Sequence, residues 1–409
     1  MRDKLSMVPR PILYYLGASF FMGLSNTIFD VVFNFYLADR GIDEAAAGAI
    51  YSIGTGAMAV AVVPLLVLPR FVSHRTLLIW ASVFFAFPFA AMPFVPSVPA
   101  AAVALGLNQV GFLGCLSLGN SIAASHVPDA ARTRLFSGFF ICYLGAGAVA
   151  SAVVSALSSL LPLADLQKYQ VILLISFLSG CLMLVLRVPS ARKTLRTDKA
   201  EATGDGITSE ERRNFAVLVL AAACLGASIT LVFRFANVLF RQIYDLPVSE
   251  ISLILGGDKV VSVVGAVVAP LLVKRFSLRP SAGFFGGLAF VSLMVQSFTV
   301  PLVVFVLFYL LRLFSNYCLM PLLDTVAISG FLPRRRLVST SLRQSSFYLG
   351  GAVAAAVYGD LLQRGNWQAT LWISGGCALA GAVAVTLVRE ADAGTRRAHP
   401  PTEKVLENA

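Results

Sequence analysis

The run YLGAGAVASAVVSAL at residues 143–157 is followed, at an offset of 205 residues, by a second run of similar small-residue character, YLGGAVAAAVYGDLL at residues 348–362. Two further pairs of segments have nearly the same offset: VVPLLVLPRF with VVAPLLVKRF (62–71 and 267–276) and FNFYL with ANVLF (33–37 and 236–240). Chance similarity between apolar segments would not favour one offset. The repetition therefore predicts two copies of one structural unit in the chain.

The composition indicates that these units lie in a membrane. Of the 409 residues, 57% are hydrophobic and only 13% are charged, with a mean hydropathy of +0.80. A soluble domain is about half apolar and about a quarter charged. Too few charged residues remain to cover a soluble protein of this size, so a large soluble helical protein is disfavoured.

The apolar residues are grouped into runs that are long enough to cross a bilayer, which takes about 20 helical residues. A β-barrel would instead show alternating segments of about ten residues. We therefore predict an all-α membrane protein with twelve transmembrane helices in two pseudo-symmetric six-helix bundles. The predicted helices span residues 11–38, 44–68, 76–95, 98–125, 134–160, 167–187, 214–240, 248–273, 280–298, 300–328, 337–362 and 367–388.

A polar stretch in the middle of the chain divides the helices into six and six. RVPSARKTLRTDKAEATGDGITSEERRN (187–214) is charged and lacks apolar periodicity. We predict an N-terminal bundle at 1–187, a cytoplasmic linker at 188–213, a C-terminal bundle at 214–390 and a cytoplasmic tail at 391–409. The SEERR segment of the linker is either mobile or the start of a short amphipathic helix.

The distribution of basic residues predicts the orientation. Lys and Arg cluster in one set of loops and near both termini, whereas the opposite loops carry mainly acidic residues such as Asp43 and Glu44. Cytoplasmic loops are enriched in Lys and Arg. Both termini are therefore expected in the cytoplasm, with the protein in a bacterial inner (plasma) membrane. Because the basic residues are spread over many loops, the net charge of +11 does not indicate nucleic-acid binding.

Sequence motifs for other kinds of chemistry are missing. The six cysteines all fall in apolar runs without metal-ligand spacing, and no GxxxxGK[ST] phosphate loop is present. We therefore expect no metal, no cofactor and no enzymatic activity.

The arrangement resembles the major facilitator superfamily of secondary transporters. The resemblance covers residues 11–390 and is strongest in the basic turn after the second helix of each half, LPRFVSHRTLL and VKRFSLRPS. These turns are similar to the family's Gly-x-x-x-Asp-Arg-x-Gly-Arg-Lys motif, although Pro69 stands about where the Asp should be. The fifth helix also lacks the Gly-Pro pair of drug–proton antiporters. The resemblance implies a substrate site between two halves that rock about it.

Small residues in the repeated runs predict close helix contacts, because such residues let helices approach closely in lipid. We expect the halves to bend and slide there, so that Gly145, Gly147, Gly350 and Gly351 take part in gating.

Charged residues inside spanning segments are costly and are functional candidates by default. Asp30 and Arg234 occupy pseudo-equivalent positions at an offset of 204. In many members of the superfamily that the chain resembles, the first helix of each half lines the central cavity. The resemblance therefore implies that the two residues face each other or share a substrate. The alternative is a structural ion pair between the halves. Asp258 and Lys259 are adjacent in one helix, so we expect only one of them to face the site.

The deep bases Arg234, Lys259 and Arg312 outnumber the deep acids Asp30 and Asp258 by one, which favours an anionic or zwitterionic solute. We predict proton coupling at Asp30 and Asp258, and a gate or structural pair at Asp324 and Arg343. The predicted substrate-binding residues are Arg234, Arg312, Lys259, Asn34, Asn237, Asn316 and Tyr36.

The sequence thus predicts a proton-coupled secondary transporter of a small organic solute that works by alternating access. Its expected partners are the solute, protons and the lipid bilayer, and it is expected to be a monomer. A proton-driven exporter of amphiphilic or cationic compounds remains an alternative. A lipid scramblase or a non-transporting receptor is an alternative of another class.

Overall fold

A computed structural model describes residues 10–95, 97–127, 129–191, 209–331 and 335–388. Within these ranges the ordered elements are helices, and there is no strand. The predicted tail at 391–409 and the central part of the predicted linker lie outside the described residues. Nine helices are long and apolar enough to cross a membrane, counted over the part of the chain that is described.

Twelve long helices account for the predicted runs, with bounds that differ by a few residues. The first six are α2 (Arg10–Asp39), α3 (Glu44–Val67), α4 (His74–Ala86), α6 (Val98–Ala124), α7 (Asp129–Leu160) and α8 (Asp165–Ser190). The last six are α9 (Ser209–Tyr244), α10 (Val248–Phe276), α11 (Leu278–Gln296), α12 (Leu302–Ser329), α13 (Arg336–Gln363) and α14 (Trp367–Leu387). Two short 3-10 helices, η1 (Leu68–Arg70) and η2 (Met92–Phe94), and the single turn α5 (Pro88–Ala91) complete the order.

The helix ends follow from local chemistry. Asp43 precedes α3 and its carboxylate accepts a hydrogen bond from the Ala46 amide, while the Asn366 side chain does the same for Ala369 at the start of α14. These oxygens satisfy backbone donors that have no partner within the helix. Pro88 lacks an amide proton, and the predicted run 76–95 accordingly divides there into α4, α5 and η2.

The structure shortens the predicted linker at both ends. α8 continues to Ser190 and α9 already begins at Ser209, so residues 209–213 belong to a spanning helix and do not form a separate surface helix. Glu210 and Glu211 lie in the first turn of α9, where negative charge favours a helix start.

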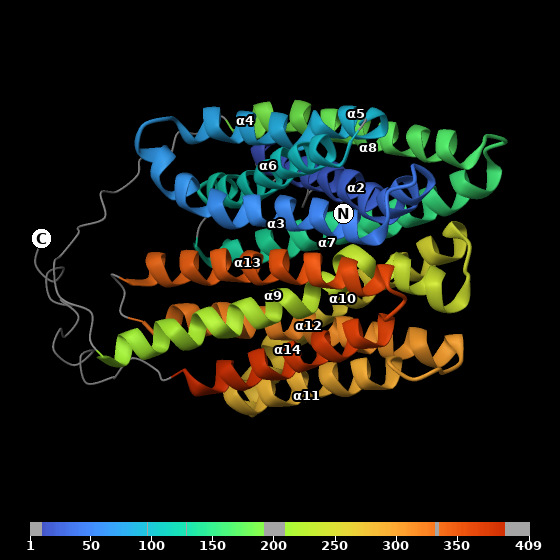
Figure 1. The fold of residues 1–409 in the computed structure, drawn as a ribbon. Coiled ribbons are helices and arrows are strands. Elements are labelled where there is room, and N and C mark those ends of the chain that lie inside the picture. Colours follow the sequence, from blue (N-terminus) through green and yellow to red (C-terminus); the bar gives the residue numbers. More distant parts are fainter. Residues whose placement is uncertain (1–9, 96, 128, 192–208, 332–334, 389–409) are drawn as a thin grey trace, which may run out of the picture.

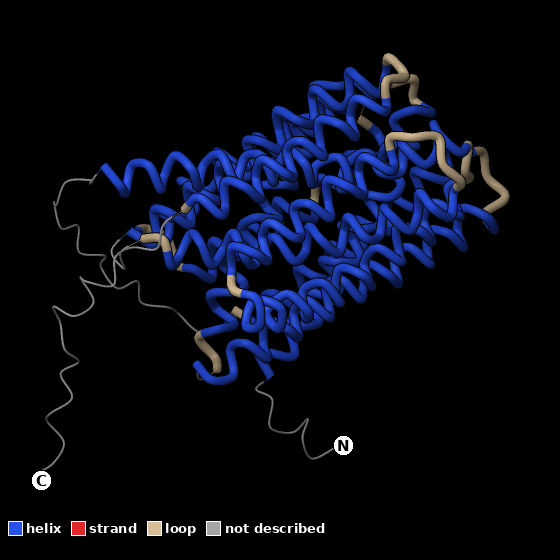
Figure 2. Tube along the Cα trace, turned by 90° about the horizontal axis from the view of Figure 1, so that it is seen from below, coloured by secondary structure: helices blue, strands red, loops and turns tan. Residues whose placement is uncertain are grey.

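The two groups of six helices form two layers that lie side by side (Figure 1). Viewed from below, the helix axes lie roughly parallel to one another, and most of the connecting loops lie at the two ends of the molecule (Figure 2). α3 and α13 run next to each other along the boundary between the layers, and α7 packs against α10. These four helices make most of the contact between the halves.

Pseudo-equivalent contacts hold each half together. In the first half, the Ser25 and Ser176 hydroxyls each donate to the other residue's carbonyl at 2.7 Å. In the second, the Ser374 hydroxyl donates to the Ser228 carbonyl at 3.0 Å. These bonds join α2 to α8 and α9 to α14, so the repeat seen in the sequence is a repeat of contacts.

Glycines make a second pair of equivalent joints. A Cβ on Gly23 would lie 2.1 Å from the Tyr143 carbonyl oxygen, and one on Gly226 would lie 1.9 Å from that of Phe347. Only glycine allows these approaches of α2 to α7 and of α9 to α13. The repeated runs that begin at Tyr143 and Tyr348 therefore pack partly within their own halves, and they are not simply sliding surfaces between the halves.

Candidate functional site

A cavity of about 240 Å³ lies between the two halves. Helices α2, α3, α6 and α7 of the first half and α9, α10, α12 and α13 of the second contribute to its wall. The polar side chains of the wall are Asn26, Thr27, Asp30, Thr55, Gln109, Thr230, Arg234 and Lys259. The aromatic ones are Phe112, Tyr143, Phe233, Tyr317, Phe347 and Tyr348. A central position between the halves is where the internal repeat places a transporter's substrate site.

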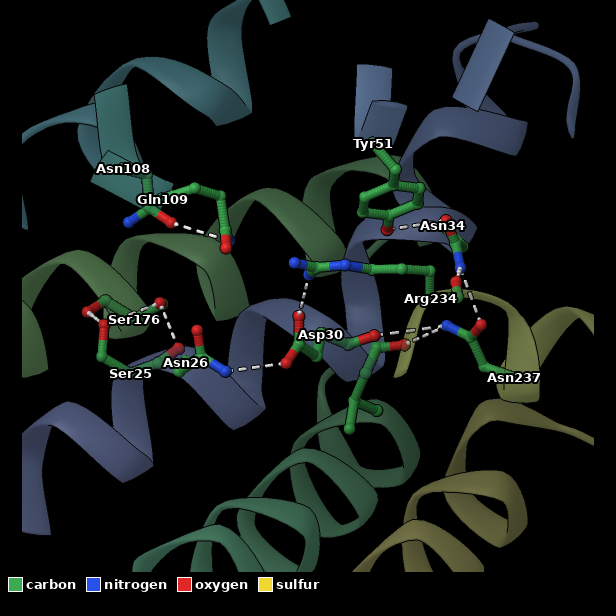
Figure 3. Close-up of polar contacts among 11 residues, drawn as sticks. Ser25, Asn26, Asp30, Asn34, Tyr51, Asn108, Gln109, Ser176, Arg234 and Asn237 are labelled. Atoms are coloured by element: carbon green, nitrogen blue, oxygen red, sulfur yellow. Dashed lines mark hydrogen bonds and ion pairs between the residues drawn. The ribbon is translucent and has the colours of Figure 1, made fainter. Parts of the chain in front are cut away.

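Asp30 and Arg234 meet across the cavity, as their offset predicts. Arg234 Nη1 lies 3.0 Å from Asp30 Oδ1, and the other carboxylate oxygen accepts from the Asn26 amide at 2.7 Å (Figure 3). The side chains of Arg234 and Asp30 remain 12% and 22% exposed, so both are accessible from the cavity. The ion pair joins α2 of one half to α9 of the other. Its functional role remains a prediction.

Lys259 lines the central cavity and Asp258 does not, although both line a small neighbouring cavity together with Asp30. The Lys259 ammonium lies 3.1 Å from Asp258 Oδ1. Asp258 is buried behind it and accepts from the Tyr309 hydroxyl at 3.1 Å. Each deep carboxylate thus has one basic and one neutral donor. A Cβ on Gly147 would lie 3.0 Å from the Lys259 side chain, so this glycine makes room for the lysine at the contact between α7 and α10.

Asn34 and Asn237 do not line the central cavity, although Asn237 lines the small neighbouring cavity that includes Asp30 and Lys259. Their role in substrate binding stays a prediction. They are 6% and 2% exposed, and the Asn34 amide donates to Asn237 Oδ1 at 2.7 Å. The Asn34 amide also donates to the Arg234 carbonyl, and Asn237 donates to the Val31 carbonyl at 3.0 Å. Their amide groups are occupied in joining the two halves (Figure 3).

A second cavity of about 440 Å³ lies beyond these amides and includes Asn34 in its wall. At its rim the halves meet again, because Gln363 donates to Asp43 at 2.8 Å and Gln242 donates to Glu44 at 3.1 Å. α3 and α13 touch at Gly48, where a Cβ would lie 2.6 Å from a carbonyl oxygen of α13. The end of the molecule that carries the α2–α3 connection is therefore closed.

Three other predicted substrate ligands lie elsewhere. Arg312 is 1% exposed, and its Nε and Nη1 have no hydrogen-bond partner among the described residues; its guanidinium lies over the Tyr309 ring, 5.4 Å from the centroid. Asn316, one turn further along α12, is equally buried. The Tyr36 hydroxyl donates to the Pro93 carbonyl at 2.9 Å. None of the three lines the central cavity. The sequence could not show this, because these helices are apolar on every side and hydropathy does not reveal which side faces the cavity.

The predicted gating residues are an ion pair and a set of glycines. Arg343 forms an ion pair with Asp324, but α13 and α12 both belong to the second half, so the pair does not connect the halves. A Cβ on Gly350 would meet the Ala223 carbonyl of the same half, whereas one on Gly351 would meet Thr230 and also Thr55 of the other half. A Cβ on Gly145 would meet no atom of the described residues within 4 Å.

The most informative residue that the sequence analysis missed is Tyr51. Its ring centroid lies 5.1 Å from the Arg234 guanidinium carbon, and its hydroxyl donates to Asn34 Oδ1 at 2.8 Å. A tyrosine in an apolar run carries no sequence signal of this kind. Thr55, which lies in the wall of the central cavity, is also uncharged and was missed for the same reason.

Solved transporter structures share this architecture. A bacterial homolog of the human lysosomal transporter Spinster, in an inward-facing conformation, matches with a TM-score of 0.74 at 13% identity, covering 92% of this chain and 96% of that one. The nucleoside transporter NupG matches with a TM-score of 0.74 at 15% identity, covering 92% and 98%. A D-xylose–proton symporter matches with a TM-score of 0.73 at 16% identity, covering 92% and 97%. At such identities the likeness shows the fold alone.

A comparison with curated protein sequences finds no match. The model of the Major Facilitator Superfamily, however, matches residues 15–331 and 218–408. Together the matches cover nearly the whole chain and include both halves. The chain belongs to the major facilitator superfamily of membrane transporters.

Proposed function

We propose that the protein is a proton-coupled secondary transporter that moves a small organic anion or zwitterion through the central cavity by alternating access. The observation that carries the proposal is the set of four deep charges at this cavity, Asp30, Arg234, Asp258 and Lys259, which form two ion pairs. Charges at this depth are costly and mark substrate or proton pathways.

The charge count supports coupling through Asp30. With all four groups ionised the set is neutral. If Asp30 takes up a proton, one positive charge is left over, and a bound monoanion cancels it. The set is then neutral both when empty and when loaded with one proton and one anion. Because a net charge in a poorly hydrated site is unfavourable, this arrangement favours uptake of the two together, in symport.

The two bases of the cavity are suited to the anionic group of the solute. Arg234 presents a planar fork that matches a carboxylate or phosphate, and Lys259 adds a compact charge. Arg312, predicted to complete this site, lies outside the cavity, so Lys259 takes its place in the proposal. Asp258, buried behind Lys259, is assigned to holding that lysine. The aromatic wall is suited to an organic body.

The size of the cavity limits the solute. A cavity of about 240 Å³ has the scale of a small-metabolite site. Under the positive-inside prediction both chain ends are cytoplasmic, and the closed end carrying Asp43 faces the outside. The protein is proposed to act as a monomer in a bacterial inner membrane.

Proteoliposomes with an imposed pH gradient test the proposal. Purified protein is screened against radiolabelled small carboxylates, phosphate esters and amino acids, with Asp30→Asn as the comparison. We expect gradient-driven accumulation of an anion or zwitterion by the unsubstituted chain, and only exchange of the bound solute by Asp30→Asn. Transport of a lipophilic cation such as ethidium, with no competition from any anion, would favour the export alternative.

A further inference from the structure

One polar layer separates the two cavities described above. Arg234 lines the inner cavity of about 240 Å³, and Asn34 lines the outer one of about 440 Å³. Between them lie the side chains of Asn34, Asn237 and Tyr51, which are 6%, 2% and 1% exposed. We refer to these three residues as the polar layer. If it opened, the inner cavity would be continuous with the outer one.

The polar layer connects the halves through a directional network. The Asn34 Nδ2 group donates to Asn237 Oδ1 at 2.7 Å and to the Arg234 carbonyl. Both acceptors belong to α9, whereas Asn34 belongs to α2. If the Asn34 amide turned by 180°, its oxygen would face two other oxygens, and both contacts would become repulsive. The layer therefore depends on which way this amide points.

Tyr51 determines that direction. Its hydroxyl donates to Asn34 Oδ1 at 2.8 Å, which holds the oxygen away from α9 and turns the Nδ2 group toward it. The Arg234 guanidinium lies over the ring of the same tyrosine, with its carbon 5.1 Å from the ring centroid. The ring also packs edge-on against Phe33 and Phe235, one from each half. Tyr51 is thus a side chain through which the position of the Arg234 guanidinium can affect the Asn34 amide (Figure 3).

From this geometry we infer that Tyr51 is a positioning residue of the transport cycle, which keeps the polar layer closed while Arg234 is paired with Asp30. When the guanidinium moves off the ring, Tyr51 loses one of its two polar contacts, and the Asn34 amide is no longer held in the bonding direction. That a solute causes this movement rests on the proposed function. The closure itself, and its dependence on Tyr51 and Arg234, do not.

Thiol labelling tests the inference without knowledge of the solute. A full-length chain with its six native cysteines replaced by alanine receives one reporter, Gln109→Cys, in the wall of the inner cavity. The reporter is on α6, which carries no residue of the layer. Its reaction with a membrane-impermeant methanethiosulfonate is timed from each side of the membrane, after size-exclusion chromatography has shown a single monodisperse species.

The test variant is Tyr51→Phe, which keeps the ring and removes the hydroxyl. The matched control is Tyr36→Phe, because the Tyr36 hydroxyl is also buried but bonds to Pro93 within the first half. From the side opposite the chain ends we expect Tyr51→Phe to accelerate labelling about five-fold, the usual effect of one hydrogen bond. The control should change nothing. Asn34→Ser shortens the side chain that accepts this hydrogen bond, so it should act in the same direction as Tyr51→Phe.

Combination with Arg234→Gln tests the link to the inner cavity. If Arg234 acts on the layer through Tyr51, the double substitution should accelerate labelling by less than the product of the single effects. Equal rates for Tyr51→Phe and its control, or equal acceleration from both sides of the membrane, would refute the closing role. Multiplying effects would refute the link to Arg234. Neither result depends on whether an anion is the solute.

Discussion

The ion pair between Asp30 and Arg234 allows structural and functional roles to be separated in one experiment. In Arg234→Gln the carboxylate of Asp30 keeps the Asn26 amide but loses the guanidinium at 3.0 Å. Breaking a fully buried pair costs about 3–5 kcal/mol. Here the two side chains are 12% and 22% exposed to the cavity, so water partly replaces the lost partner. We expect a loss of about 2 kcal/mol, within the range for a hydrogen bond to a charged group.

The double substitution Asp30→Asn with Arg234→Gln removes both charges and keeps the side-chain volumes. It should recover the stability to within about 1 kcal/mol, since two neutral amides can bond to each other. The assay is thermal unfolding of the purified protein in detergent, run beside gradient-driven transport. Arg364→Gln is the control, because its pair with Asp360 at 2.9 Å is 70% and 48% exposed and should contribute less than about 1 kcal/mol.

Transport distinguishes the two roles. If Asp30 and Arg234 carry the proton and the solute, the double variant is stable but does not accumulate solute. If they form only a structural pair, the restored stability brings gradient-driven transport back, and that result would refute the functional reading. An unchanged melting temperature in Arg234→Gln would instead refute the energetic reasoning from the 3.0 Å contact.

Three further predictions concern topology, closure and Arg312. Asp43→Cys should be labelled by an impermeant thiol reagent applied to whole cells, and Arg335→Cys only after the membrane is permeabilised; the reverse would invert the orientation. Gly48→Val should open the end that carries Asp43, because its Cβ would lie 2.6 Å from a carbonyl oxygen. Spin-label distance measurements test this, with Gly56→Val as the control, since a Cβ there meets its nearest atom only at 3.8 Å. Arg312→Met should leave the solute affinity within about two-fold and the melting temperature unchanged or raised. The reason is that it removes a buried charge with no ionic partner among the described residues. A ten-fold loss of affinity in equilibrium binding would show that Arg312 belongs to the site.

The sequence was sufficient to predict the helices and the main ion pair. The long apolar runs match the helices because hydrocarbon requires backbone groups to be satisfied within the segment. Asp30 and Arg234 meet because the two halves repeat and their first helices are pseudo-equivalent. The offset in sequence therefore corresponds to a symmetry relation in space.

The sequence was insufficient where the rotation of a helix about its own axis decides the outcome. Arg312 and Tyr36 lie in helices that are apolar on all sides, because one side meets lipid and the other meets protein. Hydropathy does not distinguish the two, so a side chain that faces the cavity looks the same as one that faces a neighbouring helix. The helices that carry Asn34 and Asn237 were predicted correctly. The hydrogen bond between the two residues forms only where the two halves pack together, and the sequence does not show that packing.

The closure at the Asp43 end also has an energetic consequence. It is held by a small number of hydrogen bonds between the halves, among them those from Asn34, Asn237, Gln242 and Gln363. Each such bond contributes about 0.5–1.5 kcal/mol net, so these hydrogen bonds together contribute a few kcal/mol, in addition to the packing of α3 against α13. One elementary charge that crosses a membrane potential of 100 mV releases about 2.3 kcal/mol. If transport is coupled to protons as proposed, the driving force from a single proton has the same magnitude as the hydrogen bonds that help to keep this end shut.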